Sequence, residues 1–385
     1  MSPDGGFDRG RDALASECVG RDALLLPSDT LFQEIGLNPT ELSRRASAWV
    51  LGVSVLCVPL AAQSQTSITL YGLADGYVAR VSDSVPTKAN DIRIGSGGLT
   101  TSYIGVSAVE DLGGGYQGLA TMQSFLRVDT GQAGRHDADP FWARDTYAGL
   151  GTPWGRITIG RNTTPFFLAT IIHNPLGDSF VVGPSVTHVF RGNLEGDTGM
   201  SNSVRYQSPK LGGFKADVLY SVGTETTDPA DKDSGQAIDA ALSYGVGEFN
   251  AVLAVRRIDL NKGYNGQEQE AWMLGGNYKF SFATLYGQYM RSKMTWNTQP
   301  DAERRTWQLG ASVPLGSGRV VGSYAKTTLD DASPVSPDRR QTWALGYIHS
   351  LSKRTELYAI YYDDKFDEPV ANRQKVVATG FRHRF

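Results

Sequence analysis

Large and polar side chains alternate along the last residues of the chain, RQKVVATGFRHRF, as far as Phe385. One face would hold Val377, Thr379, Phe381, His383 and Phe385, and the other Ala378, Gly380, Arg382 and Arg384. A period of two predicts a β-strand whose two faces meet different environments. We therefore expect a strand over these residues with an aromatic side chain at its end.

Two-faced segments recur along the middle of the chain. In residues 242–244, 272–278 and 343–347, one face is aliphatic or aromatic and the other is small or polar. Tyr and Trp fall mostly near the ends of such segments, as in the aromatic belts that meet lipid headgroups. Any one of them could be ordinary strand-forming content, but the whole series favours belts.

Seven tight turns divide the chain after residue 63 into hairpins, centred near Gly114, Pro153, Gly212, Gly247, Ser281, Gly316 and Ser352. In the second half they recur roughly every 35 residues, the length of two membrane-spanning strands, one turn and one longer loop. The longer loops alternate with the tight turns and are rich in Asp, Asn, Pro and Gly. Closure of the first strand on the last then predicts an all-β fold, a sixteen-stranded antiparallel transmembrane β-barrel.

Composition does not separate this barrel from a soluble all-β protein. The mean hydropathy is −0.28 and aromatic residues make up 10 % of the chain. A membrane barrel has no need of high hydropathy, because only alternate residues of each strand meet lipid. A β-propeller would repeat self-similar blade motifs, and we find regular spacing without such motifs.

The spacing of the turns breaks once, between Pro153 and Gly212, where the chain has about twenty residues more than the period requires. The surplus lies between Arg161 and Ser203. Because a sixteen-stranded barrel is too wide for side chains to fill, we expect this third long loop to fold inside and narrow the lumen. An external flap or adhesive loop is the alternative.

Residues 42–62, LSRRASAWVLGVSVLCVPLAA, have the positive, apolar and small-residue order of a secretory signal peptide. We expect residues 1–62, an extension plus this signal peptide, to be removed and residues 63–385 to form the barrel. Removal takes away Cys18 and Cys57, which suits an oxidising compartment. It also takes five Arg and eight acidic residues from totals of 37 and 40, leaving 32 of each sign. No basic excess then points to nucleic acid.

Several motifs together resemble the trimeric general porins of Gram-negative bacteria, particularly the β-proteobacterial type. They are ITLYGLADGYV, AVEDLGGGYQG, RDTYAGLGTPWGRITIGR, NSVRYQSPKLGGFKADVLYS and the closing FRHRF. The resemblance covers about residues 63–385. It implies a homotrimer in the outer membrane, in contact with lipid and lipopolysaccharide, that lets ions and small hydrophilic solutes diffuse without a cofactor. In that family the assembly machinery reads the terminal aromatic residue, here Phe385.

In that family, basic residues of the barrel wall face acidic residues of the third loop across a constriction. Arg144 in RDTYAGL and Arg205 in SVRY match wall positions, and strand alternation places Arg127 on the polar face. Arg93 and Arg161 are further candidates. Arg161 shares its parity with two isoleucines, so it would reach the lumen only if its strand ends there.

On the loop, the segment LEGDTG resembles the acidic segment of the family, which makes Glu195 and Asp197 the expected acids. Asp178 is a further candidate, and Arg191 would offset part of their charge. An opposed pair of charged walls would orient dipolar solutes while water and ions pass.

The sequence departs from the family at two basic positions, where Leu73 and Tyr103 stand instead. Asp75 is also expected to face inward. These three residues predict a weaker basic wall than usual.

Nothing in the sequence predicts catalysis. His173 and His188 have no neighbouring ligands at metal-site spacing, and no GxSxG motif is present. Two other functions stay open. One is a substrate-selective channel with a binding site in the third loop, formed by Phe166, Phe167, His173, His188 and Phe190. The other is an adhesive or structural barrel with a blocked lumen.

Overall fold

A computed structural model describes residues 66–84, 91–191, 193–224, 234–261, 267–296, 300–330, 339–367 and 372–385. The predicted extension and signal peptide lie outside the described residues, as do the tips of several long loops. The cleavage near Ala62 therefore stays a prediction.

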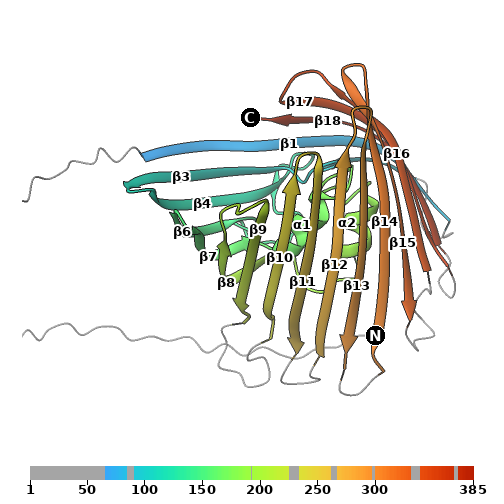
Figure 1. Cartoon of the computed structure of the whole chain (residues 1–385). Coiled ribbons are helices and arrows are strands. Elements are labelled where there is room, and N and C mark those ends of the chain that lie inside the picture. The colour runs from blue at the N-terminus through green and yellow to red at the C-terminus, as the bar shows by residue number, and fades with distance from the viewer. Residues whose placement is uncertain are drawn as a thin grey trace, which may run out of the picture. The chain divides into compact units, whose positions relative to one another are not determined.

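The described chain is a sheet of strands with two short helices (Figure 1). The strands are β1 (Thr66–Asp83), β2 (Asp91–Ser96), β3 (Tyr103–Gly113), β4 (Tyr116–Arg127), β5 (Gln132–Ala133), β6 (Thr146–Thr152), β7 (Gly155–Thr163), β8 (Gly199–Gln207), β9 (Phe214–Val222), β10 (Gln236–Val246), β11 (Phe249–Asn261), β12 (Gln267–Lys279), β13 (Thr284–Thr295), β14 (Ala302–Leu315), β15 (Gly318–Asp330), β16 (Arg339–Ser350), β17 (Thr355–Phe366) and β18 (Asn372–Arg384). The helices are α1 (Pro165–Ile172) and α2 (Pro184–Phe190).

The sheet closes on itself because β1 pairs antiparallel with β18, from Leu73 opposite Arg384 to Asp83 opposite Gln374. Sixteen strands form the wall, as predicted. Two of the eighteen segments are not separate wall strands. β2 and β3 pair with successive halves of β1 and together make one wall strand, and β5 is a two-residue partner of the end of β4.

The break between β2 and β3 is a segment, residues 97–102, that Asp75 holds. The Asp75 carboxylate accepts hydrogen bonds from the backbone N–H groups of Gly98, Leu99 and Thr100 at 2.9–3.1 Å. The Tyr358 hydroxyl of β17 donates to the same carboxylate at 2.7 Å. Asp75 is fully buried, so its charge orders this segment and is not exposed to the lumen.

The third long loop lies inside the barrel, as predicted, and carries both helices (Figure 1). We call residues 164–198 the inner loop. One side of it packs on the wall through buried Phe166, Val189, Val252 and Met273. A second cluster joins the inner loop to the wall strands nearest the seam. Among the described residues, no helix is long and apolar enough to cross a membrane.

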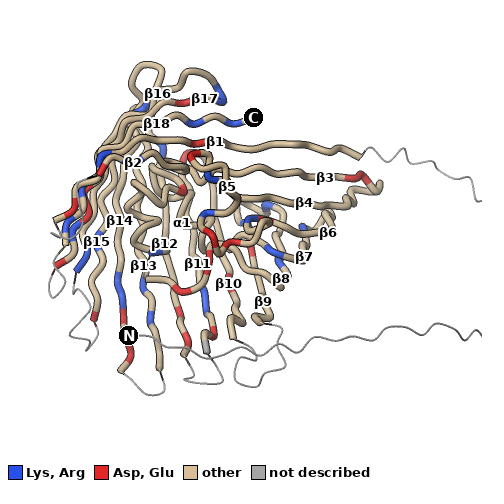
Figure 2. The backbone as a smooth tube through the Cα atoms, turned by 180° about the vertical axis from the view of Figure 1, so that it is seen from behind, with Lys and Arg blue, Asp and Glu red and all other residues tan. Residues whose placement is uncertain are grey.

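The outer face of the wall is apolar and edged by aromatic side chains. Toward the rim with the long loops, aromatic pairs link neighbouring strands at 4.8–5.4 Å between ring centroids, namely Trp272–Tyr289, Trp307–Tyr324 and Trp343–Tyr361. Toward the rim with the tight turns lie Phe214–Tyr244 and Tyr278–Phe280. Two such bands are the arrangement that meets the two lipid headgroup layers. Charged residues of β13 to β15 gather beyond the first band, toward the long loops (Figure 2).

Candidate pore constriction

Hydrogen bonds from the wall fix the inner loop along its whole length. Thr164 caps α1 by accepting from the backbone N–H of Phe167 at 3.2 Å, and Pro165 suits the first turn because that turn needs no N–H donor. The Phe166 N–H donates to Asp239 of β10 at 2.7 Å. Gln288 of β13 then donates to the carbonyl of Thr170 at 2.7 Å.

Three further hydrogen bonds hold α2 and the end of the inner loop. His188 is fully buried, and its two ring nitrogens lie 2.7 Å from the hydroxyls of Thr327 and Thr342. Burial holds the pKa of His188 well below its usual range, so the ring is neutral. Gln269 accepts from the Glu195 N–H at 2.7 Å, where the inner loop turns back toward β8.

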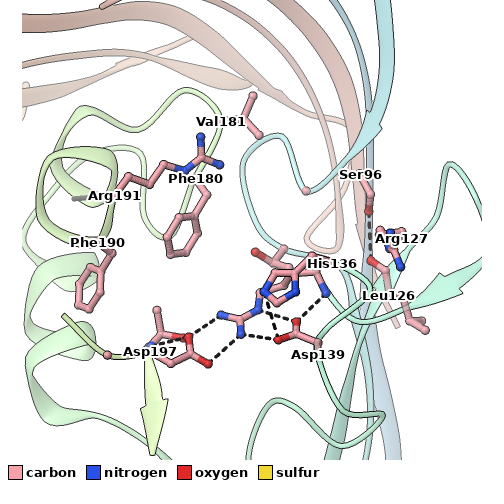
Figure 3. Close-up of a pocket in the computed structure, with 15 residues that line it drawn as sticks. Ser96, Leu126, Arg127, His136, Asp139, Phe180, Val181, Phe190, Arg191 and Asp197 are labelled. Atoms are coloured by element: carbon pink, nitrogen blue, oxygen red, sulfur yellow. Dashed lines mark hydrogen bonds and ion pairs between the residues drawn. The ribbon is translucent and has the colours of Figure 1, made fainter. Parts of the chain in front are cut away.

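Two connected cavities separate the inner loop from the opposite wall. The outer cavity has a volume of about 600 Å³ and opens between Phe180, Phe190 and Arg191 on one side and residues of β2, β4 and the following loop on the other (Figure 3). The inner cavity is smaller, about 120 Å³, and lies against α1, β8 and the residues 143–145 that precede β6. Four residues line both cavities, namely Thr101, Arg135, Phe180 and Thr198. The small inner cavity is therefore the candidate constriction.

Arg144 and Arg205, the two arginines carried over from the family pattern, line the inner cavity. Arg205 is held in a two-pronged pair by Asp217 of β9, at 2.5 and 2.8 Å. Arg144 has a different environment. It donates to Gln123 at 2.7 Å, and its guanidinium lies 3.8 Å from the centroid of the Tyr103 ring. Within the described ranges no carboxylate forms an ion pair with Arg144, so its charge is available to solutes.

Asp197 lies at the edge of the outer cavity and faces arginines other than Arg144 and Arg205. It accepts from Arg135 at 2.6 and 2.8 Å and from Arg161 at 2.6 Å. Burial alone would raise the pKa of Asp197, but Arg135 and Arg161 lower it to about 2. Arg135 also binds Asp139 at 2.8 Å, so it bridges two acids between the second long loop and the inner loop.

Arg135 is a residue that the sequence reasoning missed. It lies in a loop, where no alternation shows which way a side chain points. Arg161, in contrast, was a candidate, but strand parity placed it on the same face as two lipid-facing isoleucines. The register of β7 and β8 shifts between Gly160 and Asn162, near the end of β7, and there Arg161 reaches Asp197 at 2.6 Å.

The other predicted charges lie farther from the inner cavity. Arg127 lines the outer cavity and pairs with Asp137 at 2.7 Å. Arg93 is exposed, has Asp91 at 3.4 Å and lines neither cavity. Glu195 is exposed at the bend where the inner loop meets β12.

Asp178 lies in the inner cavity, half-buried on the inner loop. Burial raises its pKa above the ordinary aspartate value, although Thr100 and Arg144 act in the opposite direction. Asp178 and Arg144 therefore line the same cavity and act on each other electrostatically.

The two departures from the family have structural explanations. Tyr103 supplies the ring on which Arg144 lies, so this aromatic residue supports a wall arginine instead of only replacing one. Leu73 is buried at the seam between β1 and β18. Arg191 lines the outer cavity 5.9 Å from the centroid of Phe180, and no ion pair of Arg191 is found in the described part of the chain.

The residues expected for a binding site in the inner loop separate into two groups. Phe166, His173 and His188 are buried against the wall, which removes them from the lumen surface. Phe167 and Phe190 line the cavities and meet edge to face at 5.2 Å. Among the described residues no cluster of His, Cys, Asp or Glu could hold a metal ion.

Comparisons with known proteins agree with this geometry. The sequence model of the Gram-negative porin family matches residues 47–369. Outer membrane porin protein 32 of Delftia acidovorans is 30 % identical over 80 % of this chain and 87 % of its own length. An outer membrane porin protein of Bordetella pertussis is 27 % identical over 84 % of this chain and 96 % of its own.

Among solved structures, an anion-selective porin from Comamonas acidovorans matches with a TM-score of 0.73 and 26 % identity, covering 83 % of this chain and all of that one. OmpT of Vibrio cholerae, in a trimer form, shares the fold at a TM-score of 0.64 and 14 % identity. The chain therefore belongs to the Gram-negative porin family and is a diffusion porin of the outer membrane.

Proposed function

We propose that ions and small hydrophilic solutes pass through the outer and inner cavities in turn, and that the constriction prefers anions. The observation that carries this preference is Arg144, a lumen arginine without a carboxylate partner in the described chain. Arg135, Arg161 and Arg205 are each neutralised in part by Asp197 or Asp217. The porin from Comamonas acidovorans, which is anion-selective, supports the same direction.

Charge substitution tests this proposal. A single-channel measurement under a salt gradient gives the ratio of anion to cation permeability from the reversal potential. In R144Q the ratio should fall roughly fivefold, because a unit charge about 4 Å from an ion in water changes its energy by about 1 kcal/mol. D197N should raise the ratio. A control variant, R354Q, lies in the turn before β17, away from both cavities. If R144Q and R354Q give the same reversal potential, Arg144 does not set the preference.

A homotrimer is the second part of the proposal. The family resemblance supports it, and OmpT of Vibrio cholerae, which shares the fold, occurs in a trimer form. Chemical cross-linking of the folded protein in detergent tests it: the expected result is a covalent trimer that persists on boiling, whereas protein boiled before the cross-linker is added should stay monomeric. A protein that yields only monomers without boiling would contradict it.

Contact with phosphate-bearing lipid, including lipopolysaccharide, is the third part. Arg291, Arg305 and Lys326 each lie two residues beyond an aromatic residue of the band nearest the long loops. Basic side chains next to such a band lie at the level of lipid phosphates.

We also propose that Phe385 is the signal read by the assembly machinery.

A further inference from the structure

The inner cavity combines two kinds of surface that a pore for hydrated ions does not require. One wall carries arginines of the barrel and of the second long loop, Arg135, Arg144 and Arg205. The opposite wall, which belongs to the inner loop, is mostly apolar and is formed by Phe167, Leu168, Ile171 and Phe180. Water-filled constrictions gain nothing from an apolar wall, so this surface calls for an explanation.

The apolar surface is built by α1 and is not a by-product of packing. Phe166, Ala169 and Thr170 face the barrel wall and are buried. Phe167, Leu168 and Ile171 lie on the other side of the same helix and are only half-buried. A helix inside a wet lumen is expected to place polar residues on its free side. Here both sides are apolar.

Phe180 extends this surface from the inner to the outer cavity. It lines both cavities, and its ring stacks on that of Phe167 at 6.2 Å between centroids and 20° between planes. Phe167 in turn meets Phe190 edge to face. The three rings form a continuous aromatic surface, which we call the phenylalanine face (Phe167, Phe180 and Phe190).

Arg144 supplies the complementary charge. Gln123 and the Tyr103 ring fix its position from behind, and its guanidinium has donors left for a carboxylate, which it can bind through two parallel hydrogen bonds. The other two arginines of the inner cavity already bind Asp139, Asp197 and Asp217. Arg144 is thus the arginine of this cavity that forms no ion pair within the described ranges, although Asp145 and Asp178 line the same cavity.

We propose that the constriction binds organic anions with an aromatic body, of the benzoate class, with the carboxylate on Arg144 and the ring against Phe167 and Phe180. This rests on the proposed diffusion function and adds the class of solute that the pore favours. The ring replaces water on an apolar surface and finds aromatic partners. A small inorganic anion gains only the charge, and a neutral aromatic solute gains only the ring contact.

Block of chloride current tests the proposal. Benzoate, acetate and benzyl alcohol would each be added to single channels of the full-length mature protein in potassium chloride. Benzoate should reduce the current at a concentration roughly ten times lower than acetate or benzyl alcohol, because the carboxylate and the ring both contribute. Equal half-blocking concentrations for benzoate and acetate would overturn the proposal.

Four variants separate the contributions. R144Q should raise the half-blocking concentration of benzoate roughly tenfold. F180A should raise it about three- to tenfold while chloride still passes. F180L keeps an apolar side chain, so a benzoate block equal to that of the wild type would show that the ring itself is not used. F282A, in the turn before β13 and 68 % exposed, is the matched control and should change nothing.

The outcomes also separate this proposal from the diffusion function itself. A folded, heat-modifiable barrel that carries chloride but shows no preference for benzoate keeps the porin and removes the aromatic-anion site. A folded barrel that carries no current at all removes both. If the preference survives R144Q and F180A together, the site is not at this constriction.

Discussion

At the scale of residues, the lumen charges differ in how closely they are paired. Asp197 has two arginine partners, whereas Asp178 lies in the inner cavity with a raised pKa. Because the pKa of Asp197 is about 2, it stays ionised at every pH at which the channel is measured. Asp178 takes up a proton at a higher pH than an ordinary aspartate does.

Anion preference should therefore rise as the pH is lowered from 7 into the acidic range, at a higher pH than protonation of an ordinary aspartate would give. Protonation of Asp178 removes a negative charge beside Arg144, while Asp197 keeps its charge. Reversal potentials measured across this range should show the rise in the wild type, and D178N should be anion-preferring throughout without it. A rise of equal size in D178N would assign the pH dependence to another group.

Protonation of Asp197 is expected to affect the stability of the fold, and acid should weaken it. Its folded pKa lies below its unfolded value of 3.8, so the stabilisation from its arginine pairs is fully present above about pH 4. It is lost only as the pH falls through about 2. Acidification to pH 5 should leave the contact between the second long loop and the inner loop intact.

At this scale, the sequence offered candidates where a strand pattern or a family motif was present. Arg144 and Arg205 line the inner cavity, and their role in a constriction stays a prediction. Arg135 was missed because loops have no period. Tyr103 was interpreted only as the replacement of a basic wall residue. The sequence does not show that its ring lies against Arg144.

At the scale of elements, the inner loop depends on the wall for its position. Its helices are short, eight and seven residues, and isolated helices of that length do not persist in water. Gln288 makes two contacts with this loop, since it accepts from Ser185 at 2.7 Å and donates to the Thr170 carbonyl at 2.7 Å. It therefore ties both helical halves of the loop to β13.

Replacement of Gln288 by leucine should loosen the inner loop without unfolding the barrel. Two buried polar groups would lose their partner, at a cost of about 1–3 kcal/mol, while the hydrogen bonds between strands remain. We expect more frequent spontaneous closures in single-channel records and an unchanged shift on heating in gel electrophoresis. Q117L, at the turn end of β4 and exposed, is the control; matching records for the two variants would contradict the anchoring role.

The length of the inner loop and its position in the lumen were predictable, because the turn spacing left a surplus and a sixteen-stranded barrel has a lumen too wide for side chains to fill. Its anchors were not. Gln269, Gln288 and Asp239 fall on lumen-facing strand positions, where a polar residue is equally expected for contact with water. Only the folded chain shows that they bind the loop.

At the scale of the whole molecule, the seam between β1 and β18 completes the barrel. Gly72 and Phe385 exchange backbone hydrogen bonds at 3.1 and 3.2 Å. A side chain at Gly72 would begin 2.5 Å from the Phe385 ring, so the glycine makes room for the terminal aromatic residue. The last strand is thus part of a closed wall with one face toward lipid and one toward the lumen, which explains its alternating side chains.

Replacement of Gly72 by valine should impair the seam, because the new side chain displaces the Phe385 ring. We expect slower folding into detergent or lipid and a lower yield of the heat-modifiable form, with F385A giving a similar but smaller loss. G118V, at a glycine without positive φ around which a new Cβ would have no atom nearer than 3.7 Å, is the control without contact to Phe385. Equal folding of G72V and the wild type would show that the seam tolerates the displaced ring.

Asp75 joins parts of the chain that lie close together in the sequence to one that lies far away. Its carboxylate gathers residues 98–100 from nearby in the chain and the Tyr358 hydroxyl from a strand 283 residues away. The local part of this cluster can form early, but its last donor arrives only when the first and last strands stand in register. Docking of residues 97–102 into the lumen is thus complete only in a chain that has closed. The complete set of donors around Asp75 is therefore a mark of the closed barrel.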